Sequence, residues 1–427
     1  MRAGVAMTVR ALVALAGVIL PAGPVVAEGG AGMPEAVARA EAELAIRPHA
    51  VDEIWRDLSS TGLPQVEAGE SDGPARVTFL IRTRDTVEAV HLDSVVNVAA
   101  ARQPVDDYLE DFTLPLQRIG AAPIWWISLD VPRDTEAVYS FLLLRDGHWQ
   151  RRSDAANPRH LRGGDAEAVL RLDRAPDMAP IRPWPARLQR QPDVLNVESA
   201  ALERVVRAQL WRNPDAASDA PVVILYDAFL WGVRAPAWEI AANLAADGRI
   251  PPVHVVLVDQ LDAASAERRY DDQTRFLADE LLPRLRGEGL TAPARQVILA
   301  GASRRGLAAS RAALQRPDAF GGVIALSGSF YWSPDGEAPE WLIRNLPPAP
   351  QHGAPRFLIA AGSLETVVTA TNAGHVMLDT NRRFAEALDA AGYPARLEVF
   401  PGGHDIAAWR HAFADGLVAL LGPDGDE

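Results

Sequence analysis

Cysteine is absent from the 427 residues of this chain. Its absence excludes disulfide bonds, a thiolate nucleophile and zinc sites built on cysteine. It says little about the compartment, because disulfides are permitted outside the cytoplasm but are not required there. A nucleophilic mechanism in this protein would therefore depend on another residue type.

Basic residues are in deficit. Lys and Arg number 42 against 56 Asp and Glu, which gives a formal net charge of −14. Non-specific binding to nucleic acid or to an anionic membrane surface depends on clustered Lys and Arg. The composition therefore predicts no nucleic-acid partner, and an anionic ligand would need a local basic patch.

Long apolar runs are scarce, and one stands out near the N-terminus. Residues 11–26 are mostly apolar, follow Arg2 and Arg10, and lead into small residues that end at Ala27. This layout is typical of a secretory signal peptide. Two prolines and a glycine interrupt the run, which leaves it short of the roughly 20 apolar residues that a spanning helix needs. We expect cleavage near Ala27, a periplasmic or secreted protein, and no stable membrane insertion after cleavage.

The chain length predicts two domains, at roughly 100 to 200 residues each. A helix is expected over residues 33–61. Short strand-like runs follow without amphipathic helices between them, at residues 76–82, 124–131 and 138–144. They favour a small β-sandwich within residues 28–174. Five prolines crowd residues 175–194, which we interpret as a linker because no regular helix or strand spans such a stretch.

Residues 195–423 alternate apolar runs with amphipathic segments. The runs are nearly continuous and rich in β-branched residues, as in strands buried on both faces of a parallel sheet. They lie at residues 222–226, 253–258, 296–300, 322–326 and 356–360. Segments with helical period accompany them at residues 275–285, 307–315 and 381–391, as crossovers between parallel strands require. The pattern predicts a doubly wound, mostly parallel α/β domain.

A candidate nucleophile follows the run at 296–300, in the segment Gly301-Ala-Ser-Arg-Arg-Gly306. A strand, a sharp turn with a central Ser303 and then a helix form the nucleophile elbow of α/β-hydrolases. The usual G-x-S-x-G pattern would place glycine at 305, where this chain has arginine. The alternative is that Ser303 only caps the helix, since serine is a favoured N-cap.

A serine hydroxyl needs a base to take its proton, and in this fold the base is a histidine that follows the acid in the chain. His404 lies in a glycine-rich loop after the strand-like residues 396–400. We expect it to be the base. His375 and His411 lie in helix-like contexts, where we expect a solvated surface role.

The acid is less determined. Glu365 follows the run at 356–360 and could hold the imidazole tautomer and stabilise the imidazolium. A loop glutamate is, however, more often simply solvated. Asp379 and Asp389 fall on expected helices, and Asp405 adjoins His404 in sequence, which makes a hydrogen bond to its ring awkward. Position alone leaves Glu365 a candidate.

Ester hydrolysis also needs donors for the oxyanion. In this fold they are the backbone N–H after the nucleophile and a second N–H from a loop after an earlier strand. We expect the first from Arg304 and the second from Ala228 or Phe229, which follow the run at 222–226.

Taken together, these residues resemble the enterochelin (ferric enterobactin) esterase family, within the wider esterase D-like group. The similarity spans about residues 76–421. The similar segments in the second half of the chain are residues 301–307, 316–321, 327–332 and 402–405, with Trp409 and Arg410. In the first half they are residues 117–119, 125, 139–141 and 154–158.

The resemblance implies an immunoglobulin-like β-sandwich packed beside an α/β-hydrolase domain, and a triad of Ser303, Glu365 and His404. It also implies hydrolysis of the trilactone of a catecholate siderophore, which releases iron. Iron is then part of the substrate, and no cofactor or protein-bound metal is expected. Family members typically have an aromatic residue and glycine after the nucleophile, where Arg304 and Arg305 stand here. Cytoplasmic members lack an export signal, so this chain is more similar to the periplasmic kind.

A ferric tris-catecholate is an anion, so an acidic protein must gather positive charge locally to bind it. Arg268, Arg269, Arg304 and Arg305 are candidates. A solvated arginine on the first helical turn is the alternative, although it is unfavourable beside the helix dipole unless an anion is near. Three aromatic residues could stack on a catechol ring: Trp231, Trp332 and Trp409.

Two other functions stay open. The same machinery could hydrolyse another acyl or aryl ester, such as a feruloyl or sugar ester, because the tryptophans would stack on either ring equally well. A catalytically silent protein could keep the fold and only bind a siderophore, because a fold does not by itself imply a function.

Overall fold

The computed structural model describes residues 32–67, 69, 73–84, 86–99, 113–163, 167–184, 191–259, 261, 269–368, 372 and 374–423. The expected signal peptide over residues 1–27 lies outside these ranges and stays a prediction. Within the ranges, no helix combines the length and the apolar character that a membrane span requires.

Two short helices open the described chain, α1 (Glu35–Ile46) and α2 (Val51–Ser59). The prediction of one helix over residues 33–61 was wrong. Pro48 lies between the two helices, and proline interrupts a helix because it lacks the backbone N–H and clashes with the preceding turn. Val37 and Ile54 of these helices pack on Leu80 and Trp126 of the following sheet.

The N-terminal lobe contains two antiparallel sheets that share one core, which confirms the predicted β-sandwich architecture. The first sheet has the strand order β1 (Gln65–Glu67), β2 (Ala75–Arg82), β6 (Ile124–Val131) and β5 (Gln117–Arg118). The second has the order β4 (Thr113–Pro115), β3 (Ala89–Ser94), β7 (Glu136–Arg145) and β8 (His148–Arg152), with β9 (Ala168–Arg171) also paired to β7. Phe79 and Leu129 of one sheet pack with Leu92 and Phe141 of the other. The closer description as immunoglobulin-like stays a prediction.

The second lobe is built on one eight-stranded sheet, and all five predicted strands are present in it. Its order is β10 (Asp193–Ser199), β11 (Arg204–Trp211), β13 (His254–Val258), β12 (Val222–Tyr226), β14 (Val297–Ala302), β15 (Gly322–Leu326), β16 (Arg356–Gly362) and β17 (Ala395–Phe400). The six strands from β13 to β17 in this order pair in parallel, whereas β10 and β11 pair antiparallel. This confirms the predicted α/β fold.

The hairpin of β10 and β11 had no counterpart among the predicted strands. Alternate residues of β10 are exposed, so no continuous apolar run marks it. The hairpin begins at Asp193, two residues before the expected domain boundary at 195. The described residues between 175 and 192 contain neither helix nor strand.

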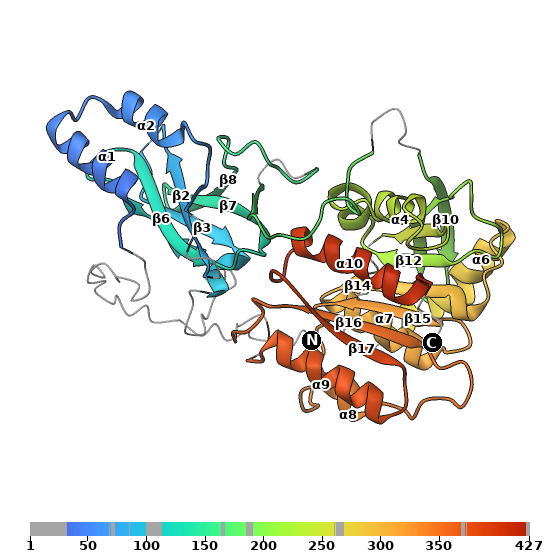
Figure 1. Ribbon diagram of the computed structural model, residues 1–427. Helices are drawn as coiled ribbons and strands as arrows, with labels where there is room; N and C mark the ends of the chain where they lie inside the picture. Colours follow the sequence, from blue (N-terminus) through green and yellow to red (C-terminus); the bar gives the residue numbers. More distant parts are fainter. Residues whose placement is uncertain are drawn as a thin grey trace, which may run out of the picture.

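Helices cover both faces of the large sheet. They are α4 (Ala237–Ala246), α5 (Arg269–Arg275), α6 (Leu282–Gly287), α7 (Arg304–Gln315), α8 (Trp341–Arg344), α9 (Met377–Ala390) and α10 (Ile406–Leu421), with π-helical segments at η3 (Leu230–Arg234) and η4 (Phe276–Leu281). Figure 1 shows α4 and α10 on one side of the sheet and α9 on the other.

The two faces have separate cores because successive strand residues point to opposite sides. Leu225 packs in the core beneath α4 and α10, whereas Ile224 packs in the core beneath α7 and α9. Phe413 and Leu417 anchor α10 and are fully buried. Burying a side chain of this size stabilises the fold by about 1.5–3 kcal/mol.

The two lobes meet where β7 contacts the start of α10. The backbone N–H of Val138 on β7 donates to Asp405 at 3.0 Å. Glu136, also on β7, lies 2.6 Å from the ring nitrogen Nε2 of His411 on α10. In Figure 1 the blue-to-cyan lobe lies beside the start of the red α10.

Candidate active site

Ser303 stands at the sharp turn between β14 and α7, as the elbow pattern predicts. Its backbone angles are φ 56° and ψ −125°, and its side chain makes no capping hydrogen bond to the helix. The hydroxyl lies 3.3 Å from the Ser329 hydroxyl instead. The interpretation that Ser303 only caps the helix is therefore wrong.

The two glycines of the elbow explain its departure from the usual pattern. A Cβ on Gly301 would stand 2.7 Å from the backbone of Arg305. A Cβ on Gly306 would stand 3.2 Å from the backbone of Gly301 and of Gly328. The close approach of α7 to β14 and to the segment after β15 thus favours a glycine at 306, one position later than the pattern expects.

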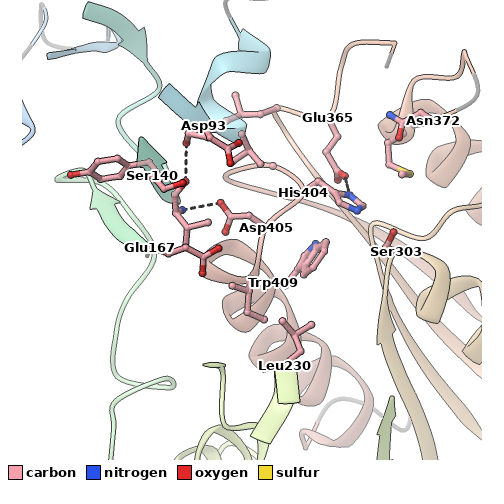
Figure 2. Close-up of a pocket in the computed structure, with 18 of the residues that line it drawn as sticks. Asp93, Ser140, Glu167, Leu230, Ser303, Glu365, Asn372, His404, Asp405 and Trp409 are labelled. Carbon is pink, nitrogen blue, oxygen red and sulfur yellow. Dashed lines mark hydrogen bonds and ion pairs between the residues drawn. The ribbon is translucent and has the colours of Figure 1, made fainter. Parts of the chain in front are cut away.

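His404 and Glu365 lie together after the carboxyl ends of β17 and β16. Nδ1 of His404 is 2.6 Å from Oε1 of Glu365, and the Glu365 side chain is buried. Figure 2 shows the His404 ring between Glu365 and Ser303. Two residues from separate loops meet here because adjacent parallel strands end at the same edge of the sheet.

The other candidate acids have different partners. Asp405 caps α10, with its Oδ1 accepting from the backbone N–H of Ala407 at 2.6 Å and of Ala408 at 3.3 Å. Asp379 pairs with Arg382 on the exposed side of α9, and Asp389 is also exposed. Of the acids considered from sequence, the structure brings only Glu365 to the ring of His404.

A cavity of about 590 Å³ opens beside these groups and takes its walls from both lobes. The second lobe contributes Ser303, His404 and Trp409. The first lobe contributes Asp93, Ser140, Arg151 and Glu167. Of these four, only Ser140 lies in a segment that resembles the family. Figure 2 shows side chains of both groups around the cavity. No sequence pattern predicts that Asp93, Arg151 and Glu167 lie at the site, because only the docking of the lobes brings them there.

The charges of the first-lobe wall are largely paired. Arg151 forms an ion pair with Asp93, and Arg234 of the second lobe forms one with Glu167. Burial raises the pKa of Asp93, and the charge of Arg151 opposes this shift. Burial lowers the pKa of Arg234, with Asp405 opposing. Within the described ranges, no three His, Asp or Glu side chains stand close enough to hold a metal ion.

A smaller cavity of about 260 Å³ also adjoins Ser303. It is lined by Tyr226, Asp227, Leu230, Trp231, Ala302, Ser303, Arg304, Arg305 and Trp409. The candidate oxyanion donors lie near this edge. Arg304 begins α7 directly after Ser303, and Ala228 is buried while Phe229 is exposed, just after β12. The N–H of Leu230 is bound to the Asp227 carboxylate at 3.0 Å. The oxyanion role of Arg304, Ala228 and Phe229 stays a prediction.

The predicted tryptophans occupy three different positions. Trp409 lines both cavities, and its ring stands nearly perpendicular to that of His404 with centroids 4.8 Å apart. Trp231 is 1% exposed and packs against Phe413 in the core. Trp332 packs against Tyr270 and lines neither cavity. Trp332 is thus separated from the other two.

The predicted arginines also separate. Arg304 is exposed and lines both cavities, and it makes no ion pair within the described ranges. Arg305 is half-buried and lines the smaller cavity. Burial raises the pKa of the neighbouring Tyr226, and the charge of Arg305 opposes that shift. Arg268 lies outside the described residues.

The remaining two histidines differ from expectation. His411 is 6% exposed and bonded to Glu136, so the expected solvated surface role was wrong. Its side chain points from α10 into the contact between the lobes, a surface that no local pattern reveals. His375 lies in the turn before α9 and stacks on Tyr331 with centroids 6.1 Å apart.

Comparison with known proteins identifies the family. The family model described as Esterase matches residues 199–420, slightly more than half of the chain. The chain belongs to this esterase family. The esterase is 27% identical to an iron(III) salmochelin esterase of Escherichia coli, with 91% of this chain and 98% of the relative covered. It is also 27% identical to an iron(III) enterobactin esterase of Dickeya dadantii, with 90% and 96% covered.

A solved structure has the same arrangement as this esterase. The enterobactin esterase of Shigella flexneri, crystallised in the presence of enterobactin, matches with a TM-score of 0.68. The sequence identity is 22%, and the match covers 86% of this chain and 97% of that chain. At this level of identity, the likeness shows that the two proteins share a fold.

Proposed function

We propose that this esterase is a serine hydrolase that cleaves the ester bonds of a catecholate siderophore trilactone. Its nucleophile is Ser303, its base His404 and its acid Glu365. The observation that carries this proposal is the 2.6 Å contact of His404 with Glu365, in a cavity that also contains Ser303. The contact occupies Nδ1 and leaves Nε2 to act on the hydroxyl.

The reaction then follows from the chemistry of these groups. The Ser303 oxygen attacks the acyl carbon while Nε2 of His404 takes its proton, and Glu365 stabilises the imidazolium. Backbone N–H groups of Arg304 and of Ala228 or Phe229 bind the oxyanion. The tetrahedral intermediate expels the alcohol, which takes the proton from His404, and leaves an acyl-enzyme. Water then attacks by the same route, releases the acid and restores Ser303.

The substrate class is supported by the relatives and by the shape of the site. Proteins named iron(III) enterobactin or salmochelin esterase align over nine-tenths of this chain. The cavity between the lobes is about 590 Å³, which is within the usual range for small-molecule sites. Arg304 supplies positive charge at its rim, as an anionic tris-catecholate requires. Iron enters as part of the substrate and leaves with the hydrolysis products.

The test is a hydrolysis assay with ferric and iron-free enterobactin beside p-nitrophenyl and feruloyl esters. Wild type should open the trilactone. Ser303→Ala should abolish turnover, and Glu365→Gln should lower kcat by roughly two to four orders of magnitude because the imidazolium loses its partner.

The controls separate the other two functions. Rapid turnover of feruloyl or p-nitrophenyl esters without opening of the trilactone would contradict the substrate class and leave the mechanism standing. A serine-directed phosphonate that fails to label wild type at Ser303 would instead indicate a binding protein. Asp389→Asn, on the exposed side of α9, serves as the matched carboxylate variant and should retain wild-type kcat.

A further inference from the structure

The second carboxylate oxygen of Glu365 is held as closely as the first. Oε2 accepts a hydrogen bond from the Ser327 hydroxyl at 2.7 Å and from the backbone N–H of Gly362 at 2.6 Å. Ser327 follows β15 at φ 47° and is completely buried. With His404 on Oε1, three donors surround this buried carboxylate.

The direction of the Ser327 hydrogen bond is set by Trp409. The indole Nε1–H donates to the Ser327 oxygen at 2.9 Å. An indole nitrogen only donates, and a hydroxyl has one proton to give. Because Glu365 and Trp409 are the two partners of this hydroxyl among the described residues, its proton points to Oε2 of Glu365. Trp409, Ser327, Glu365 and His404 therefore form one chain of hydrogen bonds.

We propose that Trp409 and Ser327 are positioning residues that orient and stabilise the Glu365 carboxylate against Nδ1 of His404. This inference rests on the proposed function and adds two residues to its machinery. A buried carboxylate is costly to ionise unless donors compensate for lost water, and Ser327 supplies such a donor. Trp409 acts through Ser327, since its N–H stabilises the hydroxyl in the orientation that donates.

Trp409 thereby has a role other than the stacking expected from sequence. Its indole N–H is directed at Ser327, while its ring stands nearly perpendicular to His404, at 79°. Replacement by phenylalanine removes the donor and keeps an aromatic ring in the core. Trp332 provides a tryptophan control, because it also packs against an aromatic neighbour but is half-buried and lines neither cavity.

The experiment measures kcat and KM of Ser327→Ala, Trp409→Phe and the double variant with a small neutral p-nitrophenyl ester. We expect Ser327→Ala to lower kcat about 10- to 100-fold and Trp409→Phe about 3- to 10-fold, which is the usual size of effect when a residue that orients a site residue is removed. KM should stay within about twofold of wild type, because neither substitution changes the contacts that bind the ester. The double variant should match Ser327→Ala, since Trp409 acts through that hydroxyl. Trp332→Phe should retain wild-type kcat.

A spectroscopic readout separates positioning from loss of structure. The His404 Nδ1 proton should give a far-downfield proton NMR signal in wild type and in Trp332→Phe. Ser327→Ala and Trp409→Phe should shift or broaden that signal while keeping the wild-type far-ultraviolet circular dichroism and cooperative thermal unfolding. The positioning role of Ser327 and Trp409 would be overturned if both variants kept the wild-type kcat and the wild-type signal. It would also be overturned if the losses in kcat of the two single variants multiplied in the double variant. Full turnover by Ser303→Ala would instead overturn the proposed function.

Discussion

At the scale of single residues, the site depends on an unusual backbone angle. Ser303 has φ 56°, which L-residues rarely adopt and which costs of the order of 1–3 kcal/mol. The surrounding strand and helix impose it, and Gly301 and Gly306 make room for them. The strain has a use, since the turn exposes the hydroxyl at the carboxyl edge of the sheet.

Arg304 is an exposed arginine at the cavities beside Ser303, and we expect its charge to attract an anionic substrate. It is exposed at the rim of both cavities and forms no ion pair among the residues that the structure describes. In Arg304→Gln we expect KM for ferric enterobactin to rise about tenfold, because one positive charge no longer attracts the anion. Turnover of a neutral p-nitrophenyl ester should stay within about twofold.

The control for Arg304 removes the same charge elsewhere. Arg286 is exposed on α6 and lines neither cavity. Arg286→Gln should leave both substrates unaffected. The increase in KM should also shrink at high ionic strength, where screening weakens long-range attraction. An equal loss of activity toward the neutral ester would contradict this prediction, because it would show that the substitution disturbs the elbow rather than the electrostatic attraction.

At the scale of elements, α10 links the histidine loop to the core. The helix begins directly after Asp405, whose carboxylate caps its first backbone N–H groups and also accepts from Val138. His404 precedes this cap by one residue. The cap therefore determines where α10 begins and, one residue earlier, where the His404 imidazole lies. Phe413 and Leu417 hold the same helix against the sheet.

Asp405 should make stability depend on pH in a defined direction. Burial raises the pKa of Asp405 to about 6, with hydrogen bonds from Val138, Ala407 and Ala408 opposing. The folded state then binds the proton more tightly than the unfolded state. The associated stability is fully present below about pH 4 and is lost as pH rises through about 6.

The variant Asp405→Asn removes that titration. Relative to wild type, its free energy of unfolding should increase between pH 4 and pH 7, by up to about 3 kcal/mol for a pKa shift of this size. Urea denaturation at several pH values measures the difference. Asp379→Asn, on the exposed side of α9, should show no such trend. A difference between Asp405→Asn and wild type that is constant with pH would contradict this prediction.

At the scale of the whole molecule, one buried carboxylate ties the lobes together. Glu136 of β7 is 2% exposed and accepts from Arg171 of its own lobe and from Arg410 and His411 of α10. Burial opposes ionisation of Glu136, but the hydrogen bond from His411 and the nearby positive charges outweigh it and lower the pKa. The first lobe is thus held against α10, the helix that follows the loop of His404.

Glu136→Gln should therefore lower the free energy of unfolding by about 3–5 kcal/mol, because it leaves buried positive groups without their counter-charge. This loss of stability should be largest at neutral pH, where Glu136 is ionised in wild type. It should shrink as pH falls below about 4.5 and then through the lowered pKa of Glu136, because wild type loses the same charge there. Glu43→Gln, in the part-exposed pair with Arg47 on α1, should change stability by less than about 1 kcal/mol. A loss below about 1 kcal/mol for Glu136→Gln would contradict the coupling of the lobes.

Prediction from sequence succeeded where the signal was local. Continuous β-branched runs marked all five central strands because both faces of a parallel sheet are buried. The strand, turn and helix around Ser303 marked the elbow. The prediction of one helix over residues 33–61 failed because Pro48 interrupts it. The β10–β11 hairpin was not predicted, because its alternating burial is also found in many surface segments. Prediction also failed for His411, whose burial depends on a lobe distant in sequence.

The sequence by itself determined the α/β fold, the order of the candidate serine, acid and histidine, and the family to which the chain belongs. Only the tertiary structure decided that Glu365 lies beside His404, that Ser327 donates to Glu365 and Trp409 to Ser327, and that first-lobe residues line the cavity. The reason is physical. Strands and turns are determined largely by residues that are neighbours in the sequence. These contacts instead join segments that meet only where the strand ends converge and where the two lobes dock.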